Sequence, residues 1–357
     1  MKTELVFNLP PSPGNPRNSE GAFLRGKRGE ILFAYSRYFG ESCHDHATCD
    51  VVLMESADEG KTWSPPRTIA RAKEDFGTKN IMSISAMEQK NGDLAFYFLI
   101  KEKDFTTSLG RTVCRDGESF TPERCIFDMP PAYYVVNNDR LIRTRDGRIL
   151  APCEWVTAET CRAEKAGPYY TSCLWSDDDG KTFQKADFDF TEPYPCDKPY
   201  GLQEPGILER EGELYLWMRT GFGRQYESRS LTGLEGFERP HPSPFTSPLS
   251  PMQIKAFDGA EYAVYNPIPR ANGYRTREAP GTWGRTPIVL RKSSDGGKTW
   301  GVLNTIEDDP TRGYSYPAMF FTKDGHLLVA YGRGNSAEGN NLCTLGISRI
   351  DLSTVEE

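Results

Sequence analysis

Acidic and hydroxyl side chains recur together in one octapeptide at three places in the chain. The copies read SADEGKTW from Ser56, SDDDGKTF from Ser176 and SSDGGKTW from Ser293. A Ser and an Asp at this spacing could form a small acidic site, but a catalytic group is not needed three times over. Asp and Ser side chains also bond nearby backbone N–H groups in turns, where Gly takes dihedral angles that other residues avoid. We therefore interpret the octapeptides as structural turns whose final Trp or Phe packs between strands.

A second chemical cluster lies in the segment ESCHDHATCD, where His44, Asp45 and His46 are adjacent in a chain with only four histidines. Imidazole and carboxylate groups can bind a metal ion or transfer protons. Neighbouring side chains of an extended segment point apart, so a metal ion would need ligands from elsewhere. We predict no metal and no other cofactor.

A second repeat shows which elements position these groups. Six segments combine a polar-Gly turn with an apolar strand, as in KRGEILFAY from Lys27 and KDGHLLVAY from Lys323, and their glycines are residues 29, 92, 147, 212, 259 and 325. Repeats spaced roughly 60 residues apart indicate equivalent structural units. Each unit reads as four strands, and four-stranded units repeated radially form a β-propeller. We predict an all-β fold, a six-bladed β-propeller with octapeptide turns. A pair of β-sandwiches would not explain six equal repeats.

The ends of the chain predict how the ring closes. The last unit ends with the strand LCTLGISRID near Asp351, and no full outer strand follows it. The segment ELVFNLP, which begins at Glu4, is a strand without another assignment. Pairing it with the last unit would hide both exposed strand edges. We therefore expect residues 1–357 to form a single propeller domain closed by the N-terminal strand.

One inner strand opens with an unusual polar run. The segment YYVVNNDRLIRT places Asn137, Asn138, Asp139 and Arg140 at its start. Polar groups at the opening of a buried strand need partners. We predict that Asn138 and Asp139 bind substrate hydroxyl groups, and a hydrogen-bond network that caps the blade is the equal alternative.

Composition excludes some classes of partner. The net charge of −7 disfavours a nucleic acid. No stretch approaches the length of an apolar membrane span, and LAFYFLI from Leu94 is strand-sized. Nine cysteines without a CxxC pair favour reduced thiols in a cytoplasmic protein. If a leader had been removed, a secreted or periplasmic protein would result, and Cys43 and Cys49 could then form a disulfide. The sequence does not predict an oligomeric state.

The octapeptide resembles the Asp-box of the sialidase superfamily, and the resemblance extends over nearly the whole chain. It implies a propeller glycosidase with its site at the centre of the ring. A Tyr–Glu pair would supply the nucleophile, an Asp would act as acid and base, and three arginines would bind the carboxylate of an acidic sugar. The implied partner is therefore a carbohydrate substrate.

The family motifs match this chain position by position. LQEPGILEREGELYLWMRT places Glu204 and Arg219 where the family has its Glu and an Arg. WGRTPIVLRKSSDGGKTW places Arg285 at the next Arg, and RGYSYPAMFF places Tyr316 at the nucleophile, with Tyr314 as the alternative. In the first unit, Asp45 matches the acid/base. Asp50 and the flanking histidines are the alternatives.

One position departs from the family. Sialidases carry their first arginine in an Arg-Ile-Pro motif, and here that position reads EGAFL, so Glu20 stands in its place. Arg25 is on the same strand at an odd offset and points to the other face. We expect Glu20 to contact an arginine in the empty site, with Arg219 and Arg285 as candidate partners, and to bind sugar hydroxyls in a complex. A different glycan, a lyase reaction and a glycan-binding propeller without catalysis are the alternatives.

Overall fold

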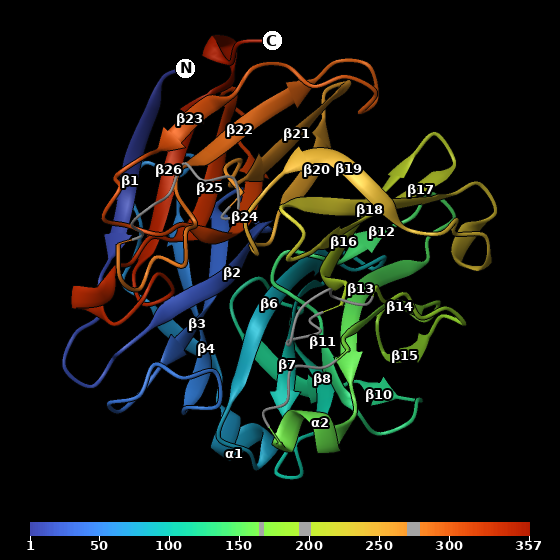
Figure 1. The fold of residues 1–357 in the computed structure, drawn as a ribbon. Coiled ribbons are helices and arrows are strands. Elements are labelled where there is room, and N and C mark those ends of the chain that lie inside the picture. Colours follow the sequence, from blue (N-terminus) through green and yellow to red (C-terminus); the bar gives the residue numbers. More distant parts are fainter. Residues whose placement is uncertain (164–167, 193–200, 270–278) are drawn as a thin grey trace.

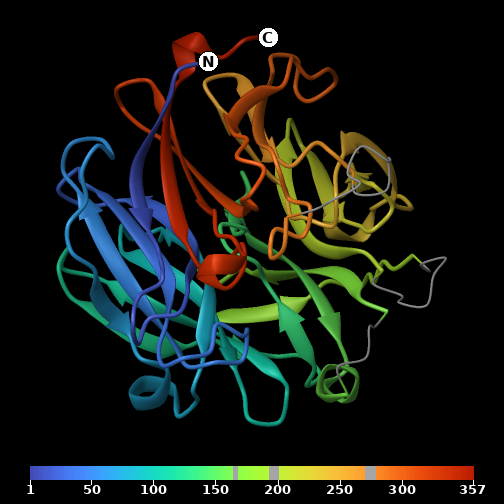
Figure 2. The ribbon, with the colours of Figure 1, turned by 60° about the vertical axis from the view of Figure 1, so that its left-hand side comes forward.

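The described part of the chain is a six-bladed β-propeller. A computed structural model describes residues 1–163, 168–192, 201–269 and 279–357. Within these residues, antiparallel sheets are arranged radially around a central axis (Figures 1 and 2). The predicted fold class is therefore confirmed.

The blades follow one another along the chain, each beginning at its innermost strand. Blade 1 contains β2 (Asn18–Arg25), β3 (Ile31–Tyr38), β4 (Cys49–Ser56) and β5 (Arg67–Ala70). Blade 2 contains β6 (Ile81–Glu88), β7 (Leu94–Lys101), β8 (Thr107–Cys114) and β9 (Phe120–Arg124). Blade 3 contains β11 (Tyr133–Val135), β12 (Ile142–Arg143), β13 (Ile149–Val156), β14 (Tyr170–Ser176) and β15 (Thr182–Lys185), with β10 (Ile126–Phe127) added along β15.

The second half of the ring repeats this plan. Blade 4 contains β16 (Gln203–Arg210), β17 (Glu213–Arg219), β18 (Arg224–Ser230) and β19 (His241–Thr246). Blade 5 contains β20 (Gln253–Phe257), β21 (Ala260–Tyr265), β22 (Ile288–Ser293) and β23 (Asn304–Glu307). Blade 6 contains β24 (Ser315–Phe321), β25 (His326–Gly332), β26 (Leu345–Asp351) and the N-terminal strand β1 (Thr3–Leu9).

The ring closes as the sequence predicts. Strand β1 pairs antiparallel with β26 over its whole length, from Thr3 opposite Ile350 to Leu9 opposite Leu345. Both termini therefore lie on the same side of the ring (Figures 1 and 2). Helices are few and short in the described residues: α1 (Ala72–Phe76), α2 (Ala158–Arg162), and the 3-10 turns η1 (Gly233–Glu235), η2 (Ser336–Glu338) and η3 (Leu352–Thr354). None of these described helices has the length and apolar character to cross a membrane.

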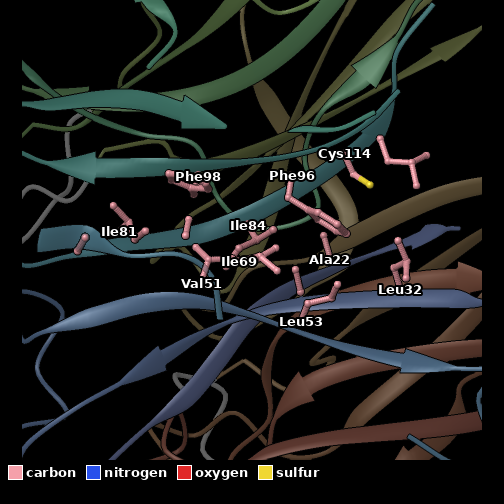
Figure 3. Packing of buried hydrophobic residues seen from close by; sticks show 14 of the residues in the cluster. Ala22, Leu32, Val51, Leu53, Ile69, Ile81, Ile84, Phe96, Phe98 and Cys114 are labelled. Atoms are coloured by element: carbon pink, nitrogen blue, oxygen red, sulfur yellow. The ribbon is translucent and has the colours of Figure 1, made fainter. Parts of the chain in front are cut away.

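The hydrophobic core lies between neighbouring blades. Figure 3 shows side chains of blade 1, including Val51 and Leu53, against Phe96 and Phe98 of blade 2. All four are essentially inaccessible to water. Burying one such side chain stabilises the fold by about 1.5–3 kcal/mol. This packing holds each blade at a fixed angle to the next, and so fixes where the innermost strands meet.

The octapeptides are turns on the outer part of the blades, as predicted. In the first copy, the Asp58 carboxylate accepts hydrogen bonds from the backbone N–H groups of Lys61 and Thr62 at 3.1 and 2.9 Å, and Ser56 Oγ donates to it at 2.8 Å. Asp178 and Asp295 repeat the pattern. The terminal aromatic rings pack inward, as Phe183 does on Tyr97 of the preceding blade. None of the three copies lines the central cavity.

A backbone irregularity recurs on the innermost strands. In β2, β6, β16 and β24, within the described residues, the pairing slips so that two residues of the inner strand face one residue of the next strand. The first residue of each slip is Glu20, Ser83, Glu204 and Tyr316, with φ of 55°, 61°, 43° and 55° respectively. This left-handed conformation costs a non-glycine residue on the order of 1–3 kcal/mol. Such β-bulges re-aim a side chain at functional sites.

Candidate active site

The bulges aim their side chains into one cavity. It has a volume of about 900 Å³, and Glu20, Ser83, Glu204 and Tyr316 all line it. Arg219, at the end of β17, and Arg285, just before β22, line it as well. The fold therefore brings together the residues that the sequence predicts from the first, fourth, fifth and sixth units.

Tyr316 and Glu204 form the pair expected for an activated phenol. The Tyr316 hydroxyl donates a hydrogen bond of 2.7 Å to Oε1 of Glu204, and Arg219 donates a short hydrogen bond to Oε2. Burial raises the pKa of Tyr316 well above its ordinary value, and the Glu204 charge adds to this effect. Burial opposes ionisation of Glu204 as well, but the charge of Arg219 and the Tyr316 hydrogen bond lower its pKa. A neutral phenol therefore faces a carboxylate that can accept its proton.

Tyr314, the alternative nucleophile that the sequence offers, is buried, and its hydroxyl accepts a hydrogen bond from the backbone N–H of Asp309.

Arg285 is a buried cation with free hydrogen-bonding capacity. Its Nε and Nη2 donate to the carbonyl oxygen of Leu249 at 3.2 and 3.1 Å, while Nη1 has no partner among the described residues. The guanidinium lies 4.9 Å from the ring centre of Trp283 and 5.7 Å from that of Tyr316. Burial, together with the nearby charge of Arg219, lowers its pKa to about 10. An anionic ligand would relieve this unfavourable environment.

Glu20 lines the cavity, but its partner differs from our expectation. It contacts neither Arg219 nor Arg285 through an ion pair; instead, Oε1 lies 2.5 Å from Nη2 of Arg17, which is only 1% exposed. Its other oxygen accepts a hydrogen bond of 2.6 Å from Ser83 Oγ. Burial raises the pKa of Glu20, although Arg17 opposes the shift. Glu20 therefore contacts an arginine, as expected, but the partner is Arg17 and not one of the two candidates, Arg219 and Arg285. Arg25 points away, as predicted, and binds Glu59 at 2.7 Å.

Asp45 pairs with Arg17, the same buried arginine that binds Glu20. It lies in the loop of residues 39–48 between β3 and β4, where its Oδ1 accepts a hydrogen bond of 2.6 Å from Nη1 of Arg17. The side chain is 57% exposed, and this surface faces the cavity, where protein groups surround it. Burial within the cavity opposes ionisation, yet the charges of Arg17 and Lys101 hold the pKa of Asp45 well below its ordinary value. The empty site therefore contains Asp45 as a carboxylate.

The residues near Asp45 in sequence differ in whether they line the cavity. His44 and His46 both line the cavity, with ring centres 5.7 Å apart. Burial, with the charge of Lys101, lowers the pKa of His46 to about 4, so its imidazole is neutral. Asp50 instead accepts a hydrogen bond of 2.8 Å from the backbone N–H of Ala72 and does not line this cavity. Among the described residues, no three His, Cys, Asp or Glu side chains are grouped as metal ligands.

Asn138 and Asp139 lie in the interior behind the cavity wall. The Asn138 amide donates to the carbonyl oxygens of Gly21 and Tyr316, both at 3.1 Å, and so joins the bulges of blades 1 and 6. Asp139 binds Lys255 Nζ at 2.6 Å and the backbone N–H of Met319 at 2.9 Å. Neither side chain lines the cavity, so their contacts match the network that was the alternative prediction. Asn137 does line it, and its Oδ1 has no partner in the described part of the chain.

Sequence reasoning missed three charged residues of the site, Arg17, Glu154 and Lys101, the last of which donates to the carbonyl oxygen of Asp45 at 2.7 Å. Arg17 precedes Glu20 by three positions, and that spacing alone does not indicate contact on a strand. Glu154 lies in the middle of β13, and its Oε2 accepts a hydrogen bond of 2.9 Å from the backbone N–H of Glu204. Burial and the charge of Glu204 raise the pKa of Glu154 to about 8. A lone carboxylate in the apolar strand ILAPCEWV was the available signal.

Comparison with known proteins agrees with the fold. Residues 32–329 match the BNR repeat-like domain. The chain belongs to this BNR-repeat family. No match was found among curated proteins. Among solved structures, the BNR-repeat chain is similar to the Hadza microbial sialidase Hz136, with 13% identity, a TM-score of 0.74, and coverage of 95% of this chain and 66% of that one.

Two further solved structures are similar to this chain. The sialidase of Trypanosoma rangeli in complex with the inhibitor DANA has 13% identity and a TM-score of 0.69, covering 93% of this chain and 55% of that one. A protein of unknown function from Dyadobacter fermentans has 17% identity and a TM-score of 0.70, covering 98% of this chain and 99% of that one. The BNR-repeat chain thus spans about two thirds or less of the length of these two sialidases. At such identities the likeness concerns the fold.

Proposed function

We propose that this BNR-repeat protein is an exo-acting glycoside hydrolase that removes a terminal acidic sugar, such as sialic acid or a related ulosonic or uronic acid. The observation that carries the proposal is the hydrogen bond of 2.7 Å from Tyr316 to Glu204. A phenol with a pKa of about 10 is a poor nucleophile alone. A neighbouring carboxylate activates it by accepting its proton during attack. A Tyr nucleophile is the alternative to two carboxylates in glycosidases.

The reaction proceeds in two displacements. The Tyr316 oxygen bonds to the anomeric carbon while the glycosidic C–O bond breaks; Glu204 takes the phenol proton, and Asp45 protonates the leaving oxygen. Water then attacks the same carbon as Asp45 accepts its proton, the bond to Tyr316 breaks, and Glu204 returns the proton to the phenolate. Two inversions at one carbon give net retention.

The charge state of Asp45 bears on the first displacement. Arg17 and Lys101 keep Asp45 ionised in the empty site, which suits the base of the second displacement. The first displacement needs a proton on this group. We expect bound substrate to raise the pKa of Asp45, because displacing water from the cavity buries the carboxylate more deeply.

Arg219 and Arg285 are the proposed carboxylate binders. Paired guanidinium groups suit a planar carboxylate because each can donate two parallel hydrogen bonds. Both guanidinium groups line the cavity. Glu20 and its partner Arg17 form a nearly neutral unit, so this pocket attracts an anion less strongly than three arginines would.

The Glu20–Arg17 ion pair also favours a second candidate function, in which the propeller takes a different glycan or binds one without cleaving it. A panel of aryl glycosides, comprising sialosides, uronides and neutral sugars, tests both. We expect release of the aryl group from an acidic glycoside, with the first-formed sugar anomer retained by NMR. Binding measured by calorimetry without product release would support the second candidate instead.

The cytoplasmic location and the single domain of residues 1–357 remain predictions from the sequence.

A further inference from the structure

Two cysteine side chains from opposite ends of the sequence meet beside the cavity. Cys43 is in the 39–48 loop, two residues before Asp45, and Cys343 is in the 333–344 loop between β25 and β26. The Asn340 amide donates to Cys43 Sγ at 3.7 Å, and Cys343 Sγ donates to Asn340 Oδ1 at 3.7 Å. One asparagine side chain thus bridges the two sulfur atoms.

Both sulfur atoms lie next to Gly339. A methyl group placed on Gly339 would lie 2.9 Å from Cys343 Sγ and 3.7 Å from Cys43 Sγ, so both atoms adjoin the same point. The backbone on both sides is anchored: Cys43 O accepts a hydrogen bond of 3.2 Å from Arg17, and Cys343 O accepts one of 3.1 Å from the backbone N–H of Asn18. The two loops are therefore held together by one short segment, residues 17 and 18.

We propose that Cys43 and Cys343 are a disulfide-forming pair that covalently joins the Asp45 loop of blade 1 to the β25–β26 loop of blade 6. The alternative bridge from Cys43 to Cys49, which the sequence allows, does not match the structure. Cys49 is fully buried at the start of β4, and its thiol donates to the carbonyl oxygen of Asp50 at 3.6 Å. The neighbour of Cys43 comes from the last blade instead.

Cys43 is the residue that an external oxidant would meet first. It is partly exposed, whereas Cys343 is buried, and burial raises the pKa of Cys343 to about 12. With oxidised glutathione as the oxidant, the Cys43 thiolate forms a mixed disulfide and releases one glutathione thiol. Cys343 then attacks the Cys43 sulfur, loses its proton and releases the second glutathione thiol. Two thiols are oxidised, and one disulfide is reduced to two thiols.

The bridge would act at a sensitive position of the ring. Asp45 and His44 line the cavity next to Cys43, and Leu342 lines it next to Cys343. Blade 6 is also the blade that closes the ring, through the pairing of β1 with β26, and the chain passes from β1 directly into blade 1. An oxidised protein therefore has the cavity loop of blade 1 fixed to the closing blade by a covalent bond.

Peptide mapping under non-reducing conditions tests the proposal without any substrate. The intact protein is incubated in glutathione buffers poised between about −180 and −300 mV, alkylated, digested and analysed by mass spectrometry. We expect one crosslinked peptide that joins Cys43 to Cys343, and its loss in Cys43→Ser and in Cys343→Ala. Cys161→Ser is the matched control, because Cys161 is also partly exposed and lines the same cavity, yet its substitution should leave the crosslink intact.

Hydrogen exchange provides the second measurement. Oxidation should slow exchange of the amides in residues 39–48 in the wild-type protein and leave Cys43→Ser unchanged. A mixed disulfide that persists on Cys43, a bridge from Cys43 to another cysteine, or two free thiols after oxidation at −180 mV would each overturn the proposal. None of these outcomes depends on glycoside hydrolysis.

Discussion

The hydroxyl of Tyr316 lies 2.7 Å from Oε1 of Glu204, although 112 residues separate the two in sequence. Each stands at the bulge of an innermost strand, Tyr316 in blade 6 and Glu204 in blade 4, with φ of 55° and 43°. The geometry of two separate blades therefore sets this one hydrogen bond, and it is the contact on which the proposed chemistry depends.

Tyr316→Phe should abolish most hydrolysis while the fold stays intact. Removing the nucleophilic oxygen should lower kcat/KM on the best aryl glycoside by about a thousandfold, which corresponds to ~4 kcal/mol of barrier. Tyr314→Phe is the matched control, since Tyr314 is a tyrosine two residues away that is fully buried and does not line the cavity. Steady-state kinetics with circular dichroism of both variants makes the comparison. Normal turnover by Tyr316→Phe would exclude the proposed mechanism.

Glu20→Arg should destabilise the protein, and Arg17→Gln should rescue it. The single substitution places a second guanidinium beside Arg17, which is 1% exposed, and unpaired like charges in a buried site are strongly unfavourable. The double variant removes that repulsion and introduces the arginine that the resemblance to sialidases implies at this position, so under the proposed function it should bind a sialoside analogue more tightly than the wild type. Thermal unfolding and calorimetry measure the two effects. A Glu20→Arg protein as stable as the wild type would show that the ion pair has little structural importance.

Glu154→Gln should flatten the pH dependence of stability. The pKa of Glu154 is raised from 4.5 to about 8 in the folded state, so between these values the native protein holds a proton that the unfolded chain has released. Stability must then fall as pH rises through this window. Gln cannot ionise, so the Tm of the variant should fall less than that of the wild type between pH 5 and pH 8. Equal slopes for the two proteins would mean that Glu154 titrates normally.

The aspartates of the three octapeptides should affect stability and not turnover. Asp58→Ala, Asp178→Ala and Asp295→Ala each remove hydrogen bonds to backbone N–H groups, so each Tm should fall by several degrees. Hydrogen bonds from Thr299 lower the pKa of Asp295 to about 2. A lowered folded pKa means that its stabilisation is present above about pH 4 and is lost as the pH falls toward 2. The wild-type advantage over Asp295→Ala should therefore shrink in that range. A folded variant with activity reduced a hundredfold would place its turn in the site.

The sequence predicts the fold because every blade repeats the same local signals. The Gly turn before an apolar strand recurs six times and indicates the number of units, and the octapeptide before the outer strand recurs in three of them. The spacing of Glu204 and Arg219 identifies two cavity residues, because a hairpin returns both of its ends to one rim. Repetition and short-range geometry are enough for these conclusions.

The charge partners could not be predicted in the same way. Arg17 binds Glu20 and Asp45 at once only because the bulge turns Glu20 back toward the start of its own strand. Glu154 meets Glu204 because blades 3 and 4 pack side by side, a relation that depends on the radial angle between sheets. Asn138 has the polar character of a ligand-binding residue, yet packing directs its amide to two backbone carbonyl groups.

The same β-bulge occurs on the innermost strands β2, β6, β16 and β24, so the inner rim has equivalent positions that hold a side chain in the same backbone geometry. Strand pairing, and not the side chain, determines where each bulge points, and the structure already shows a carboxylate, a hydroxyl and a phenol held in the same backbone geometry. The side chain at one bulge can therefore be substituted while the side chains at the other bulges keep their orientation. On blade 1, an exchange of Glu20 for arginine also requires a change of its charge partner Arg17, so new specificities on this scaffold depend on the bulge residue together with the group that it pairs with.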